Sequence, residues 1–133
     1  MKLLLSVLVA FGLFAGFGGS PGDDFEASKA RGKEVYFAYC VTCHLGGGEG
    51  IPGAFPPLAK SDYLMADAER AARVVKFGQQ GAIVVNGVAY NSYMAPLGLD
   101  DEEVADVTNF IMNAWGNVRD TMVTVEFVKG LKK

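Results

Sequence analysis

The motif Cys40-Val41-Thr42-Cys43-His44 is the most specific feature of the chain. Two thiols three positions apart, with an imidazole directly after the second, are typical of covalent c-type haem attachment. Residues three and four apart share one side of a helical turn, so Cys40, Cys43 and His44 can face one flat macrocycle together. The motif therefore predicts two thioether bonds to a haem and a histidine ligand to its iron.

Two other kinds of site use the same residue types. A C-x-x-C pair can form a redox disulfide of the thioredoxin kind, but that motif is expected in a βαβ context, which the flanking sequence does not offer. A zinc site takes about four ligands, and the chain has only two cysteines and one histidine, so a carboxylate or water would have to complete it. The motif favours haem over both alternatives.

The second iron ligand can be sought by elimination. His44 is the only histidine, so one chain cannot supply two histidine ligands to one haem. Methionine is the usual partner of histidine in electron-transfer haems, and it raises the reduction potential. The chain has five methionines: Met1, Met65, Met94, Met112 and Met122. Met1 begins the leader segment and is set aside.

Met94 is the favoured ligand because of its surroundings. The segment 91–96, Asn-Ser-Tyr-Met-Ala-Pro, is predicted to be a loop, and a loop can bring a thioether to the second face of the haem. Met65 and Met112 fall in predicted helices, where a core role is expected. Met122 lies in a short connection near the C-terminus and stays open as an alternative.

Residues 1–20 differ from the rest of the chain. Lys2 is the only charge before Asp23, and residues 3–17 are almost continuously apolar, which is typical of a signal peptide and short for a membrane span. We expect cleavage near 18–20 and export to the periplasm. An uncleaved leader acting as an inner-membrane anchor is the alternative, since no clean A-x-A site is present.

The remaining residues, 21–133, are expected to form one domain. The net charge of the full chain is −3, and this mildly acidic balance argues against nucleic acid as a partner. A helix is predicted from Phe25 to the first cysteine, with Gly32 and Tyr36 on the same side as Cys40. A glycine inside a helix suggests a close crossing, and the C-terminal helix is the expected partner.

The later part of the chain alternates helical and turn signals. A helix is predicted over 67–77, ended by Gly78, and a β-hairpin is predicted around Asn86-Gly87. The last long helix is expected to begin after Asp100, with Glu103 completing a capping box, and to end at Gly116.

The loop after the motif is too rich in glycine for regular structure and is expected to wrap one side of the haem. Phe55-Pro56-Pro57-Leu58 then supplies a rigid apolar wall. The Nδ1–H group of His44 needs an acceptor that holds the ring in its ligating tautomer, and we predict the carbonyl oxygen of Pro56 for this role.

Together these features resemble the class I mono-haem cytochrome c family. The resemblance rests on Gly32 and Tyr36 before Cys40, the Cys40–His44 motif, Pro56 with Leu58, Met94 in a late loop, and Val107 with Phe110 in the last helix. Three short sequences are similar to those of cytochrome domains associated with copper nitrite reductases and periplasmic dehydrogenases. They are residues 55–59, Tyr90-Asn91, and residues 113–117, Asn-Ala-Trp-Gly-Asn.

The resemblance implies an all-α, class I cytochrome c fold, with three to five helices around one covalent haem and a small β-hairpin before the methionine loop. It implies that residues 21–133 are a cytochrome c domain. Cys40 and Cys43 would be the thioether sites, while His44 and Met94 would bind the iron. Pro56 and Leu58 would line the haem site.

The function implied is one-electron transfer in the periplasm, without catalysis by the chain itself. The redox partners implied are a copper nitrite reductase, a periplasmic dehydrogenase, a bc1-type complex or a terminal oxidase, and a membrane contact is expected only with an uncleaved leader. Two alternatives stay open. One is a haem enzyme or gas sensor with an open or displaceable distal site, and the other is a fixed electron-transfer subunit of a larger oxidoreductase.

Overall fold

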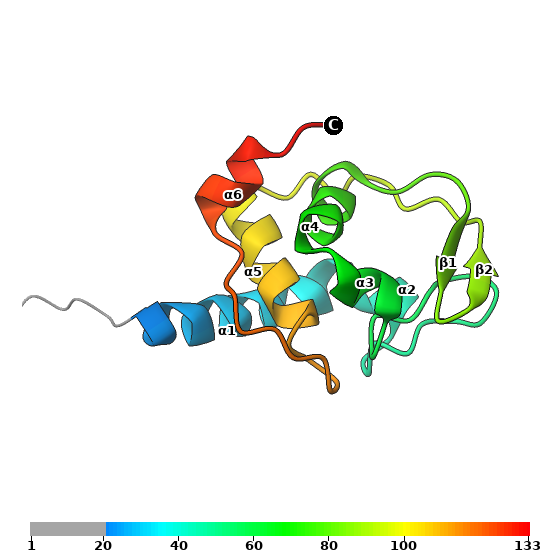
Figure 1. Cartoon of the computed structure of the whole chain (residues 1–133), viewed down its shortest axis with the longest axis horizontal. Helices are drawn as coiled ribbons and strands as arrows, with labels where there is room; N and C mark the ends of the chain where they lie inside the picture. The colour runs from blue at the N-terminus through cyan, green and yellow to red at the C-terminus, as the bar shows by residue number, and fades with distance from the viewer. Residues whose placement is uncertain (1–20) are drawn as a thin grey trace, which may run out of the picture.

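The computed structural model describes residues 21–133, so the expected signal peptide, 1–20, lies outside the described residues. Figure 1 shows helices packed around one another, with a small hairpin at one end. The helices are α1 (Pro21–Tyr39), α2 (Val41–His44), α3 (Asp62–Ala66), α4 (Ala68–Phe77), α5 (Asp101–Ile111) and α6 (Val125–Gly130), and the strands are β1 (Ile83–Val85) and β2 (Val88–Tyr90). The predicted architecture of helices with one small hairpin is confirmed for this part of the chain.

The crossing of α1 with α5 is the centre of the core (Figure 1). Gly32 is buried where the two backbones meet, as its place inside a predicted helix suggested. One turn later Tyr36 is fully buried, and its ring lies 5.5 Å from that of Phe110 and 4.9 Å from that of Trp115. Burial of these aromatic surfaces stabilises the crossing.

A buried polar cluster joins the same two helices, and no sequence pattern predicts it. Asp106 is only 4% exposed and receives two hydrogen bonds from Arg31, at 2.6 and 2.9 Å, and one from the Ser28 hydroxyl at 2.6 Å. The hydrogen bond to Asp106 raises the pKa of Arg31. Asn109 donates to Ser28 and also pairs with both backbone groups of Val123. The cluster therefore fixes the C-terminal segment against the helix crossing.

Helix α5 begins as predicted and ends earlier than predicted. Asp100 and Glu103 form the full capping box. The helix stops at Ile111 instead of running to Gly116, because the chain turns back over the loop that follows the motif. Trp115 adopts a left-handed backbone conformation, with φ of 54°, and its indole N–H donates to the carbonyl oxygen of Gly46 at 3.2 Å.

The hairpin is a two-stranded antiparallel unit with the predicted turn. Asn86 and Gly87 both have positive φ, 50° and 79°, which is the geometry of a type I′ turn. Asn86 also exchanges two hydrogen bonds with Asp62, at 3.0 and 2.7 Å. These two hydrogen bonds join the turn of the hairpin to the start of α3.

Candidate haem site

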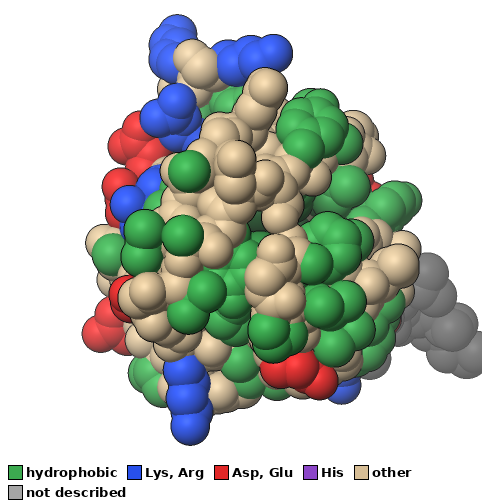
Figure 2. Space-filling view, turned by 90° about the vertical axis from the view of Figure 1, so that its right-hand side faces the viewer, with side chains coloured by type: hydrophobic (Ala, Val, Ile, Leu, Met, Phe, Trp, Pro, Cys, Tyr) green, Lys and Arg blue, Asp and Glu red, His purple; other side chains and the backbone are tan. Residues whose placement is uncertain are grey.

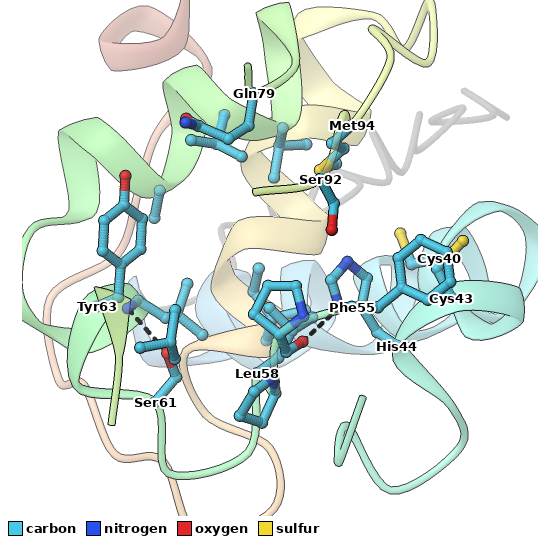
Figure 3. A pocket seen from close by; sticks show the side chains of 18 of the residues that line it. Cys40, Cys43, His44, Phe55, Leu58, Ser61, Tyr63, Gln79, Ser92 and Met94 are labelled. Carbon is cyan, nitrogen blue, oxygen red and sulfur yellow. Dashed lines mark hydrogen bonds between the residues drawn. The ribbon is translucent and has the colours of Figure 1, made fainter. Parts of the chain in front are cut away.

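A cavity of about 310 Å³ lies between α2, the loop after it, α3, α4, the hairpin and the Met94 loop (Figure 3). Its volume is in the range of small-molecule sites, about 300–1,000 Å³. All six residues singled out in the sequence line it: Cys40, Cys43, His44, Pro56, Leu58 and Met94. The fold thus brings the motif and the Met94 loop, which lie far apart in the sequence, to the same cavity.

The imidazole of His44 is oriented by the backbone, as predicted. Its Nδ1 atom lies 3.0 Å from the carbonyl oxygen of Pro56, a contact drawn as a dashed line in Figure 3. Burial lowers the pKa of His44, and the hydrogen bond to Pro56 offsets part of that shift. The ring is therefore neutral at neutral pH. With Nδ1 donating to Pro56, Nε2 keeps the lone pair that a metal ligand needs.

The loop after the motif holds the Pro56 carbonyl in place. Gly50 donates its N–H to the carbonyl oxygen of His44 at 3.1 Å, which folds the loop back on the motif. A β carbon on Gly50 would lie 2.4 Å from the carbonyl oxygen of Phe55 and 2.7 Å from that of Pro56. Only a glycine with its positive φ of 65° allows this approach.

The two thiols lie at one side of the cavity, where α1 meets α2 (Figure 3). Cys40 and Cys43 are both free and partly buried, so no disulfide joins them. Burial raises the pKa of Cys40 to about 11, which keeps this thiol protonated at neutral pH. A redox dithiol would need the opposite shift. Within residues 21–133, no three or more His, Cys, Asp or Glu side chains are grouped so that they could hold a metal ion.

Met94 enters the cavity from its own loop (Figure 3). The backbone of Met94 pairs with that of Gln79, at the end of α4, through two hydrogen bonds of 2.9 Å each. Met112 is fully buried in the core, in agreement with the role predicted for it. Met65 and Met122 do not line the cavity, so Met94 is the one methionine among the described residues that does.

Several residues at the cavity carried no signal in the sequence. The Ser92 hydroxyl donates to the carbonyl oxygen of Ala54 and so ties the methionine loop to the loop after the motif. Tyr39 and Tyr93 line the cavity and are also 51% and 65% exposed, which places them at its mouth. Single polar or aromatic residues in loops have no periodicity, and only the folded chain shows what they contact.

The cavity fits a flat apolar group with a metal at its centre. Most of its lining side chains are aliphatic or aromatic, while two thiols, one imidazole and one thioether reach it from separate elements. Thiols can form thioether bonds at the edge of a porphyrin, and imidazole nitrogen and thioether sulfur both bind iron. The donor set is therefore the one that a covalent haem requires.

Comparison with known proteins agrees with this chemistry. The family model described as Cytochrome c matches residues 29–115. The chain belongs to the class I cytochrome c family. The matched range contains the motif, the cavity lining and α5. Cytochromes c of this class carry one covalently attached haem c, so haem c with its iron is the cofactor of this chain, and electron transfer by a c-type cytochrome is its general function.

Three relatives illustrate the range of proteins that this cytochrome resembles. Cytochrome c-552 of Thermus thermophilus is 40% identical over 114 residues, covering 79% of this chain and 76% of the relative. Cytochrome c6 of Gloeothece citriformis is 32% identical, covering 84% and 92%. The cytochrome c subunit of the quinone alcohol dehydrogenase of Gluconobacter oxydans is 34% identical, but the match covers 76% of this chain and only 22% of that subunit.

Within residues 21–133, none of the helices combines the length and the apolar character that crossing a membrane requires. The longest, α1, has 19 residues and carries several acidic and basic side chains before its last five residues. The expectation of a leader anchor concerns residues 1–20 and falls outside the described part of the chain.

Proposed function

We propose that this cytochrome is an exported one-electron carrier of the periplasm, in which Cys40 and Cys43 hold the haem and His44 and Met94 bind its iron. The observation that supports this most directly is that His44 and Met94 reach the same apolar cavity from different elements. When bound, haem c supplies a one-electron ferrous–ferric couple. With both axial positions filled by side chains, the chain would have no catalytic site of its own.

The residues around the cavity would keep both ligands in place through each electron transfer. Pro56 accepts the hydrogen bond that fixes the His44 ring, and the pairing of Met94 with Gln79 fixes the methionine loop. Ligands that move little during oxidation and reduction favour rapid transfer. Leu58 and the aliphatic lining would keep water away from a bound haem, and this would favour the ferrous state because the added charge of the ferric state is poorly solvated in apolar surroundings.

The electron would pass through the mouth of the cavity. Figure 2 shows that the face at this end of the molecule is mainly apolar or uncharged across its middle, with Lys, Arg, Asp and Glu at its edges. Tyr39 and Tyr93 contribute to the mouth. An uncharged contact surface suits the small, brief encounters that electron-transfer proteins make.

A periplasmic dehydrogenase is the partner class that the relatives favour, because cytochrome subunits of such enzymes are among them. A copper nitrite reductase, a bc1-type complex and a terminal oxidase are the other partners we propose. Residues 1–20 would be a cleaved signal peptide, and residues 21–133 the mature cytochrome domain. N-terminal sequencing of protein from the periplasmic fraction tests this boundary. A mature chain that still begins at Met1 would contradict it.

Absorption spectra of the haem-loaded protein test the ligand assignment. We expect a low-spin haem with a sulfur-to-ferric-iron charge-transfer band and no spectral shift of the ferrous form under carbon monoxide. Met94→Ala should abolish the band and allow carbon monoxide to bind, since it removes the thioether. Met122→Ala is the matched control, because Met122 does not line the cavity, and it should change neither property.

The opposite result has a definite meaning. Carbon monoxide binding to the unaltered protein would show an open or displaceable iron site and would favour the haem enzyme or gas sensor. A charge-transfer band that survives in Met94→Ala and disappears in Met122→Ala would show that Met122 is the ligand.

A fixed subunit of a larger oxidoreductase is the second candidate, and the similarity to dehydrogenase subunits favours it specifically. Purification from native membranes and periplasm under mild conditions separates the two. A free carrier would run at its own mass in the periplasmic fraction. A fixed subunit would remain with a dehydrogenase through several columns.

A further inference from the structure

A second pocket of about 400 Å³ adjoins the haem cavity, and Tyr93 and Pro96, on either side of Met94 in the sequence, help to line it. Three cationic side chains line it: Arg70 and Arg73 from α4, and Lys133 at the end of the described chain. No Asp or Glu lines it. The terminal carboxylate of Lys133 offsets part of this charge, but two arginines and one lysine still leave an excess of positive charge here, in a chain whose net charge is −3.

These three cations form no ion pair with any of the described residues. Within residues 21–133, the salt bridges join Lys29 with Glu26, Arg31 with Glu102 and Asp106, and Lys76 with Asp101. Lys76 lies on the same helix as the two arginines but is already paired. Figure 2 shows Lys and Arg side chains gathered at the top of the face that carries the cavity mouth, on the side of the C-terminal end.

Arg70 is held in position and is incompletely bonded. Its guanidinium lies 3.9 Å from the centre of the Tyr63 ring, and Nη2 donates to the carbonyl oxygen of Tyr63. Its Nε atom is buried and has no hydrogen-bond partner among the described residues. Buried N–H groups in native proteins are normally paired, so this Nε is an exception; because it is buried, a ligand in the pocket would be bound by the terminal nitrogens of the guanidinium instead.

We propose that this pocket binds a small oxyanion, such as phosphate or a compact di- or tricarboxylate, and that binding lowers the reduction potential of the haem. Guanidinium groups bind such anions through paired hydrogen bonds with matching geometry. The pocket has the volume of a small-molecule site, and its cations come from segments about sixty residues apart, so folding assembles it.

The link to the haem follows from shared walls. Val74, Gln79 and Tyr93 line both this pocket and the haem cavity, and Pro96 of the methionine loop also lines it. A negative charge held here stabilises the ferric state relative to the ferrous state, because the ferric iron carries one more positive charge. The coupling is reciprocal, so the ferric protein binds the anion more tightly than the ferrous protein does.

Inorganic phosphate is the probe for the test, titrated into the haem-loaded ferric protein at constant ionic strength. We expect saturable binding by calorimetry or NMR, weakened about tenfold by Arg73→Gln or Lys133→Gln through the loss of one charged hydrogen-bond donor. Lys33→Gln removes the same charge from an exposed position on α1, away from the pocket, and should leave the affinity unchanged. The midpoint potential should fall as phosphate is added, and this fall should be smaller in Arg73→Gln.

Three results would overturn the proposal. Phosphate binding that never saturates would show that the cations serve another purpose, such as contact with an acidic protein surface. If Lys33→Gln and Arg73→Gln weakened phosphate binding equally, the binding would depend only on the net charge of the protein and not on this pocket. Saturable binding without any change in potential would remove the link to the haem. The affinity measurement needs no redox partner, so it stands apart from the test of the axial ligands.

Discussion

A β carbon on Gly32 would lie only 1.9 Å from the carbonyl oxygen of Asp106, well inside van der Waals contact. The backbones of α1 and α5 approach each other this closely because position 32 has no side chain. The helices cannot separate freely, since Arg31 and Tyr36 anchor α1 on either side of the glycine.

Gly32→Ala should therefore lower the free energy of unfolding by about 3 kcal/mol, the upper part of the usual range for overpacked cores. Guanidinium denaturation of the haem-loaded protein, followed by circular dichroism, measures it. Gly130→Ala is the matched control, because Gly130 lies in α6 with open space around it. That variant should be neutral or slightly stabilised. An unchanged stability in Gly32→Ala would show that the crossing is looser than described.

Gly50→Ala should disturb His44, the proposed iron ligand, without touching it. A β carbon at position 50 meets the carbonyl groups of Phe55 and Pro56 and would push the Pro56 oxygen away from Nδ1 of His44. A weaker hydrogen bond makes the imidazole a poorer donor to ferric iron. We expect the reduction potential to rise by up to about 60 mV, which corresponds to a tenfold change for a one-electron couple.

Gly53→Ala separates this effect from backbone strain in the same loop. Gly53 also has a positive φ, 75°, but nothing lies within 4 Å of a β carbon there. The potential of this variant should stay close to that of the unaltered protein. Protein-film voltammetry of all three proteins gives the comparison, and equal shifts in both variants would mean that strain alone is responsible.

Asp106→Asn should cost about 2 kcal/mol of stability, because it removes a buried charge that accepts hydrogen bonds from Arg31 and Ser28. Glu26→Gln is the control. It breaks an exposed pair with Lys29 and should change stability by less than about 0.5 kcal/mol. Thermal unfolding at low and high salt measures both. A cost for Asp106→Asn that disappears at high salt would indicate long-range charge effects instead of local bonding.

Asn86→Gly tests the link between the hairpin and α3. Glycine keeps the positive φ that the turn requires, but it removes the oxygen that accepts the backbone N–H of Asp62. We expect faster amide exchange in β1 and β2, equivalent to about 1 kcal/mol of lost protection. Asn91→Gly, at an exposed position just after β2, should leave the exchange of β1 unchanged. Protection that survives in Asn86→Gly would show that side-chain packing alone closes the hairpin.

The parts of this cytochrome that the sequence predicts well are those with a local cause. The capping box of Asp100 and Glu103 and the turn at Asn86 each depend on a few neighbouring residues, and the structure confirms them. The hydrogen bond between His44 and Pro56 was also predictable, because a histidine ligand needs an acceptor and a proline carbonyl is free to serve.

The parts that escaped prediction depend on contacts between distant segments. The apolar spacing of α5 continues to Trp115, yet the helix ends at Ile111. The chain turns there because the indole of Trp115 packs against Gly48 and donates a hydrogen bond to the carbonyl oxygen of Gly46. Periodicity cannot distinguish an apolar residue on a helix face from one that folds back over a loop. Likewise, the sequence around Arg31 predicts an ordinary surface cation, and only the fold shows that it pairs with the buried carboxylate of Asp106.

The pairing of Met94 with Gln79 uses only peptide groups, and every amino acid except proline offers the same N–H and carbonyl at these two positions. The side chain at position 79, which faces both pockets, is therefore free to change while the methionine loop stays in register. Mutations there could adjust the driving force of electron transfer in small steps, with little penalty in folding. The side chain at position 79 would then adjust the reduction potential, while the backbone pairing holds the methionine loop. Related proteins would in this way be able to suit donors of different potential without a change in their iron ligands.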